Sequence, residues 1–70
     1  MLTDEQFVRG LKISKVCTKK GWKHSTEMQI ASIIANAENK ENVISKIEDI
    51  IDKFTEKEAI VLLDKIRHHK

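Results

Sequence analysis

Apolar residues recur every three or four positions along most of the chain, which is the spacing of amphipathic helices. The clearest stripe covers residues 43–54, where apolar side chains share one face of a helix and charged side chains share the other. Its apolar members are Val43, Ile44, Ile47, Ile50, Ile51 and Phe54. The four isoleucines follow a period of 3.6 rather than 2, so the sequence predicts a helix here despite their β-branching.

Helix-start signals mark two further segments. Thr3 is followed by Gln6, and Thr55 is followed by Glu58. Each pair has the spacing of a capping box, in which the hydroxyl and the longer side chain each bond the other residue's backbone N–H. The sequence therefore predicts one helix that begins after Thr3 and another that begins after Thr55.

The end of the first helix and the start of the second are also marked. Gly21 follows two lysines, and a glycine just past a helix end accepts the left-handed conformation of a C-terminal cap. Thr26 with Gln29 resembles another capping box, so we expect the second helix to begin at Ser25 or Thr26. Residues 39–42 form the expected connection to the third helix.

The first helix is expected to bury one arc and expose a basic one. At about 100° per residue, the inner arc comprises Phe7, Gly10, Leu11, Ile13, Ser14 and Cys17. The outer arc comprises Arg9, Lys12, Lys15, Lys19 and Lys20, with Val8 and Val16 among them.

The second helix is expected to be the most buried, because apolar residues cover most of its circumference. These are Met28, Ile30, Ala31, Ile33, Ile34, Ala35 and Ala37, which leave a narrow polar strip of Gln29, Ser32 and Asn36. The fourth helix has an inner face of Ala59, Ile60, Leu62, Leu63 and Ile66, with Val61 pointing outward. The short connections favour antiparallel neighbours, so the predicted fold is all-α: a compact bundle of four short helices that forms a single domain over residues 1–70.

The length and composition narrow the class of protein. A chain of 70 residues allows one domain. Cys17 is the only cysteine, so an intrachain disulfide is excluded and a reducing compartment is favoured. The N-terminal sequence has neither the positive nor the apolar region of a signal peptide, and no apolar run could span a membrane. We therefore expect a cytoplasmic protein without membrane contact. The chain is also rich in Ile, Lys, Glu and Asn, whose codons are AT-rich, which points to an AT-rich genome such as that of some bacteria and mobile elements.

Charge is distributed unevenly although the net charge is only +2. Residues 7–26 hold six lysines and arginines and no acid, whereas residues 38–58 are acid-rich and residues 65–70 are basic again. Such asymmetry favours an interaction with an acidic protein surface, or self-association through basic-to-acidic pairing. The predicted partner-binding residues are Arg9, Lys12, Lys15, Val16, Lys19, Lys20, Trp22 and Lys23. The predicted function is a small interaction module that acts as a regulator, adaptor, inhibitor or assembly component.

Nucleic-acid binding through the basic first helix and the loop after it is the alternative. The strip of Gln29, Ser32 and Asn36 offers side chains that can bond base edges. Against this alternative, the second helix lacks positive charge, and the acidic third helix would repel a phosphate backbone if it faced the same side. Trp22 could stack on a base or fill a partner's pocket, but packing at the end of the bundle is favoured because a small core needs its largest side chain.

Catalytic and metal sites are not expected. Cys17 and His24 could form a nucleophile and base, but Cys17 falls on the inner arc, where a thiol acts as a small apolar side chain. A metal site would have to combine Cys17, His24, His68 and His69, whose spacing matches no zinc pattern. The sequence therefore predicts a protein that is not an enzyme and carries no cofactor.

Overall fold

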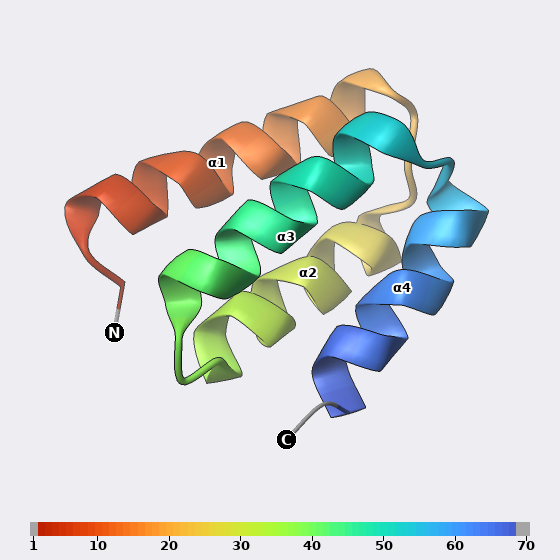
Figure 1. Cartoon of the computed structure of the whole chain (residues 1–70). Coiled ribbons are helices and arrows are strands. Elements are labelled where there is room, and N and C mark those ends of the chain that lie inside the picture. The colour runs from red at the N-terminus through yellow and green to blue at the C-terminus, as the bar shows by residue number, and fades with distance from the viewer. Residues whose placement is uncertain (1, 69–70) are drawn as a thin grey trace.

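The computed structural model describes residues 2–68 and has an all-α fold. Within these residues the chain forms four helices and no strand: α1 (Asp4–Lys19), α2 (His24–Asn36), α3 (Lys40–Lys53) and α4 (Glu56–His68). α2 and α3 pack together in the middle, with α1 on one side and α4 on the other (Figure 1). α1 packs mainly on α3, while α4 contacts both central helices. The predicted bundle of four short helices is confirmed.

Two of the three predicted capping boxes form, those at Thr3 and Thr55, and the one predicted at Thr26 does not. Thr3 donates its backbone N–H to Gln6 Oε1 at 3.0 Å, and Gln6 returns its own N–H to Thr3 Oγ1 at 3.1 Å. At the start of α4, the N–H of Thr55 donates to Glu58 Oε1 at 3.1 Å, and the N–H of Glu58 donates to Thr55 Oγ1 at 3.4 Å. These bonds satisfy backbone donors that a helix start leaves without an intrahelical partner.

The predicted start of α2 was wrong by one or two residues. α2 begins at His24, with Lys23 in the N-cap position and no side-chain cap. Thr26, the expected cap, is only 2% exposed and lies inside the first turn. The N–H of Lys23 instead donates to Glu56 Oε2 of the α4 start at 2.6 Å. The chain therefore re-enters a helix almost directly after Gly21, and a tertiary contact takes the place of the local cap.

α3 also begins earlier than expected, within the segment assigned to the connection. Asn39 caps it, because its Oδ1 accepts the backbone N–H of Asn42 at 3.1 Å. This placement shortens the link between α2 and α3 and keeps the two central helices close.

α2 and α3 supply most of the buried side chains. α2 buries Thr26, Ile30, Ile33 and Ile34, and α3 buries Ile44, Ile47, Ile50 and Ile51. The outer helices add Ile13 and Cys17 from α1 and Ala59 and Leu63 from α4, and Trp22 completes this core from the α1–α2 loop. The predicted stripe on α3 is thus buried as expected, except for Phe54, which is 38% exposed at its end.

The predicted inner arc of α1 was partly wrong. Ile13 and Cys17 are buried, but Phe7 and Leu11 are 55% and 48% exposed. Val16, which was expected to point outward, is half-buried and packs against the core. α1 is rotated toward α3 because polar contacts from its basic side hold that side against α3, as described below.

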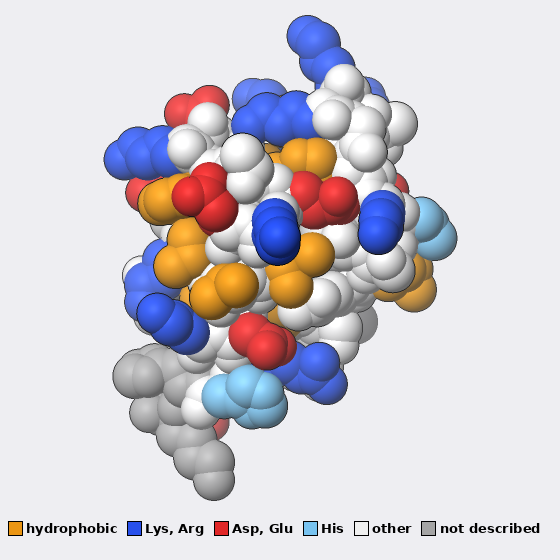
Figure 2. All heavy atoms as spheres, turned by 90° about the vertical axis from the view of Figure 1, so that its right-hand side faces the viewer, with side chains coloured by type: hydrophobic (Ala, Val, Ile, Leu, Met, Phe, Trp, Pro, Cys, Tyr) orange, Lys and Arg blue, Asp and Glu red, His pale blue; other side chains and the backbone are white. Residues whose placement is uncertain are grey.

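Two other helices also expose more apolar surface than the sequence predicts. Met28 of α2 is 58% exposed, and Ala31 and Ala35 are exposed as well, so α2 is not covered on most of its sides. On α4, Ile60 was expected to face inward but is 37% exposed, while Val61 points outward as predicted. On the side of the molecule where α4 lies, several hydrophobic side chains lie near one another among charged ones (Figure 2).

Candidate functional site

The predicted basic face of α1 divides into two groups of side chains. Arg9 and Lys20 bond residues of α3, and Arg9 is also half-buried. Lys12, Lys15 and Lys19 are exposed and form no ion pair with any residue of the described part of the chain. Only this second group can meet a partner without breaking contacts inside the bundle.

Arg9 joins α1 to the acidic helix α3. Its guanidinium forms ion pairs with Glu41 and Glu48, and it also donates a hydrogen bond to Ser45 Oγ at 3.2 Å. The hydrogen bond to Glu48 raises the pKa of Arg9 above its ordinary value. The acids that would repel a phosphate backbone therefore lie directly beside the basic helix.

Lys20 and Trp22 close the end of the bundle near the α1–α2 loop. The ammonium of Lys20 donates to the backbone carbonyl of Ile51 and lies 5.8 Å from the centre of the Trp22 ring, within the range of a cation–π contact. Trp22 itself is only 9% exposed and belongs to the core. The expectation that Trp22 packs at the end of the bundle is confirmed.

The exposed side of α1 combines lysines with apolar side chains. We call this surface the outer face of α1 and define it as Phe7, Val8, Leu11, Lys12, Lys15 and Lys19, all of which are exposed. The helical spacing of four places Phe7 beside Leu11 and Val8 beside Lys12. Lys23, the remaining predicted residue, is exposed next to the start of α2. Sequence reasoning placed Val8 on this face but missed Phe7 and Leu11, because it assigned them to the core.

A shallow cleft separates the outer face from α3. Lys12 lines it from α1, and Glu48, Asp49 and Asp52 line it from α3. Opposite charges thus face each other across this cleft. The positive potential of α1 is weakened on that side by its own neighbour.

A polar contact between α1 and α2 was not predicted. Glu27 Oε1 accepts hydrogen bonds from the hydroxyls of Thr18 at 2.9 Å and Ser14 at 3.1 Å, and His24 Nδ1 lies 3.5 Å from its other oxygen. These bonds, Thr18's first, lower the pKa of Glu27 although partial desolvation opposes the shift. Glu27 is the only acid of α2, which was the signal in the sequence that could have suggested an internal partner.

The side chains considered for catalysis and metal binding have different environments. Burial raises the pKa of the Cys17 thiol to about 11, so the nucleophilic thiolate is disfavoured. The His24 side chain is 83% exposed and its contact is Glu27, and His68 lies in the last turn of α4. His69 lies outside the described residues. Among residues 2–68, no three His, Cys, Asp or Glu side chains are grouped so that they could hold a metal ion.

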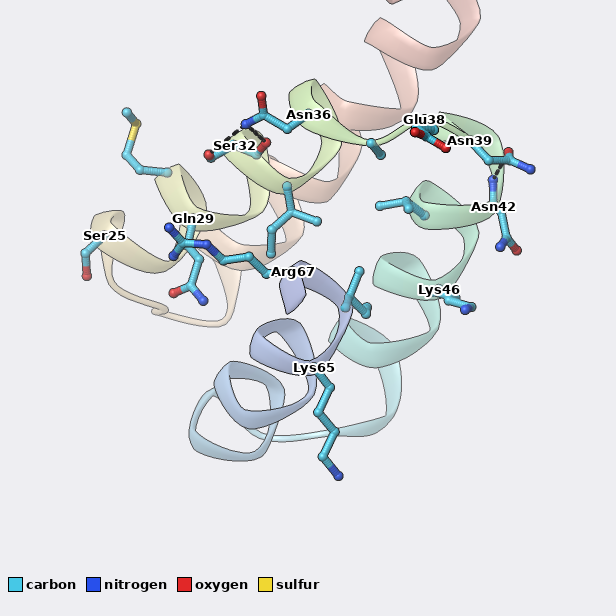
Figure 3. Close-up of a pocket in the computed structure, with 15 residues that line it drawn as sticks. Ser25, Gln29, Ser32, Asn36, Glu38, Asn39, Asn42, Lys46, Lys65 and Arg67 are labelled. Atoms are coloured by element: carbon cyan, nitrogen blue, oxygen red, sulfur yellow. Dashed lines mark hydrogen bonds between the residues drawn. The ribbon is translucent and has the colours of Figure 1, made fainter. Parts of the chain in front are cut away.

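A hollow in the described surface lies between α2, α3 and α4, away from the outer face of α1. We call it the α2–α4 groove; it has a volume of about 1230 Å³. All three members of the predicted polar strip, Gln29, Ser32 and Asn36, line it, and Figure 3 shows them on one wall. Sequence reasoning found this strip but not the groove, because the groove depends on where α4 ends relative to the two central helices.

Comparison of the chain with protein-family models, with curated proteins and with solved structures gives no match. None of the helices within residues 2–68 combines the length and the apolar character that crossing a bilayer requires. The geometry of the two surfaces is therefore the basis for the function proposed below.

Proposed function

We propose that this protein is a non-enzymatic helical module that binds a protein partner through the outer face of α1, as a regulator, adaptor, inhibitor or assembly component. The observation that carries the proposal is the exposure of Phe7, Val8 and Leu11, at 55%, 61% and 48%, on one helix surface. Neighbouring exposed apolar side chains, unlike scattered ones, are typical of interaction sites. Solvation alone would account for the lysines but not for this apolar group.

The charge of the same face indicates the chemistry of the partner. Lys12, Lys15 and Lys19 continue the helix surface beyond Val8 and Leu11, at spacings of three and four residues. An acidic protein surface with an apolar centre would complement both halves of the face. Cys17 is the only cysteine and cannot form an intrachain disulfide, which fits a reducing compartment, so the cytoplasm is the proposed location of this interaction.

Nucleic acid is the weaker candidate for this face. Glu41, Glu48, Asp49 and Asp52 of α3 lie beside α1, where they would oppose a phosphate backbone. In addition, Trp22 is packed in the core, so its ring is not presented for stacking on a base.

The test is a pull-down with the immobilised full chain at physiological salt, followed by mass spectrometry and by measurement of the affinity for the captured protein. We expect the double reversal Lys12→Glu with Lys19→Glu to weaken binding by about tenfold or more while the helical circular dichroism signal is retained. The matched control is Lys53→Glu with Lys57→Glu, which makes the same change in net charge on α3 and α4 and should leave the affinity unchanged.

Two results would contradict the proposal. Equal weakening by both double variants would mean that only net charge matters. Tight, steeply salt-dependent binding to mixed DNA and RNA, lost in the Lys12 and Lys19 double variant, would favour the nucleic-acid alternative. Sedimentation that shows self-association of the wild-type chain but not of the Lys12 and Lys19 double variant would identify a second copy as the partner of this face.

A further inference from the structure

The α2–α4 groove is a second candidate binding surface, and it does not depend on the outer face of α1. Its floor and rim include the apolar side chains Ile33, Val43, Ile66 and Met28, of which Met28 is 58% exposed. The amides of Gln29, Asn36, Asn39 and Asn42 and the hydroxyl of Ser32 line its walls. A groove with an apolar floor and polar walls suits an amphipathic occupant.

Three cations and one acid surround this groove. Lys46 lies on α3, and Lys65 and Arg67 lie on the last turns of α4, whereas Glu38 is the acid. None of these cations forms an ion pair within residues 2–68. Figure 3 shows the Arg67 side chain extending from α4 toward Gln29 of α2, with Lys46 and Lys65 at the outer edges. The excess of positive charge calls for a negatively charged occupant.

We propose that the α2–α4 groove binds an acidic amphipathic helix of a protein partner. Its volume of about 1230 Å³ is at or above the upper end for small-molecule pockets, so a peptide segment fits it better than a metabolite. The walls are helices without a strand edge, which excludes pairing of an extended peptide with a sheet. No aromatic side chain lines the groove, so it lacks the surface on which proline-rich segments and unpaired bases stack.

The bound helix would place its apolar stripe on Ile33, Val43 and Ile66. Acidic side chains flanking that stripe would then reach Arg67 on one edge and Lys46 or Lys65 on the others. The amide of Gln29 can donate to and accept from the polar side chains at its margins. Asn36 Nδ2 already donates to the backbone carbonyl of Ser32 at 2.9 Å, so Asn36 contributes its Oδ1 as an acceptor. The polar strip of α2 is therefore a wall that orients the guest helix.

A synthetic peptide tests this directly. The probe is a helix-forming peptide of about 14 residues with leucines at i, i+3, i+4 and i+7 and glutamates at the flanking positions, titrated into the isotopically labelled full chain. Amide chemical shifts should change along α2, the start of α3 and the end of α4, and stay unchanged on the outer face of α1. The same peptide with lysines in place of the glutamates should bind roughly fivefold more weakly or worse.

Two matched pairs of variants identify the contacts. Arg67→Glu should weaken peptide binding roughly fivefold, whereas Lys57→Glu, on the same helix but outside the groove, should not. Met28→Asp should weaken it as well, whereas Val61→Asp should not, although the wild-type side chains are equally exposed at 58% and 56%. All four side chains are exposed, so each variant is expected to fold.

Several results would overturn the proposal. They are the lack of any shift at millimolar peptide, shifts centred on α1, or equal effects within either pair of variants. Stronger shifts of the same amides with a single-stranded oligonucleotide would identify nucleic acid as the occupant. Concentration-dependent shifts of these amides without peptide would identify a second copy of this chain. The function proposed for the outer face of α1 is tested separately, with the Lys12 and Lys19 double variant.

Discussion

The backbone N–H of Trp22 donates a hydrogen bond to the carbonyl of Cys17 across 2.9 Å, and this bond determines how α1 ends. A second bond, from the N–H of Gly21 to the carbonyl of Thr18 at 3.0 Å, completes a Schellman motif. The motif requires a left-handed residue, and Gly21 has a φ of 77°. The chain therefore reverses at Gly21 and delivers the Trp22 ring into the core.

Gly21→Ala should destabilise the protein by about 1 kcal/mol, because a Cβ is disfavoured at this backbone conformation. The control is Gly10→Ala within α1, which should stabilise the protein by roughly 0.5–1 kcal/mol by removing helix-interior glycine. A Cβ at either position would meet no atom within 4 Å, so steric clashes do not confuse the comparison. Urea unfolding measures both, and a stabilising Gly21→Ala would contradict the assigned turn.

Trp22→Ala should cost about 3 kcal/mol, because it removes a large side chain that is only 9% exposed. Trp22 is the only tryptophan, so its fluorescence reports this site alone. Emission of the native chain should be blue-shifted and poorly quenched by acrylamide, and should shift to the red on unfolding. Native emission like that of free tryptophan would show that the ring is not packed.

Glu27→Gln should reduce the dependence of stability on acid pH. The hydroxyls of Thr18 and Ser14, and then His24, hold the pKa of folded Glu27 below its ordinary value of 4.5. The stabilisation is therefore fully present above pH 4.5 and is lost as the pH falls through the folded-state pKa. Urea unfolding at pH 7 and at pH 3 should show a larger loss for the wild type than for Glu27→Gln. Asp64→Asn, an exposed change on α4, is the control and should behave like the wild type.

The Cys17 thiol should react with a disulfide reagent such as DTNB only when the protein unfolds. Burial raises the pKa of the thiol to about 11, so little of the reactive thiolate forms at neutral pH. The Cys17 side chain is also fully buried, so the reagent cannot reach its sulfur. At neutral pH, reaction in urea should be rapid, and reaction without urea should be slower by orders of magnitude. Rapid labelling of the native chain would place the thiol at the surface and reopen a chemical role for it.

The parts of the fold that were predicted correctly from the sequence are those determined by residues close together along the chain. Caps such as Thr3 with Gln6 and the turn at Gly21 depend on atoms a few positions apart, and the stripe of α3 depends on a single period. The start of α2 was missed because the backbone N–H of Lys23 donates to Glu56, which is 33 positions away, and no local side chain caps the helix. Local patterns contain no information about such a partner.

The rotation of α1 shows the same limit for the candidate site. An averaged apolar arc placed Phe7 and Leu11 inside, but Arg9 bonds Glu41 and Glu48 and turns its side of the helix toward α3. The lysines of the outer face and Val8 were therefore predictable from the sequence, whereas the exposure of Phe7 and Leu11 required the structure. The α2–α4 groove could be recognised only from the structure, because residues of three helices form it.

Phe7 and Leu11 provide the sharpest comparison between the periodic pattern and the structure. If the apolar arc decided burial, Phe7→Ser and Leu11→Ser would each cost as much as a core substitution. Because both side chains are about half exposed, each should change the free energy of unfolding by only about 0.5–1 kcal/mol. Ile13→Ser, on the same helix but only 2% exposed, should cost about 3 kcal/mol or more, since it leaves a cavity and a buried hydroxyl. Urea unfolding of the three variants measures the difference. Equal losses would mean that α1 is not rotated as described and that the outer face of α1 lacks its apolar half, whereas a large gap would leave Phe7 and Leu11 available to a partner.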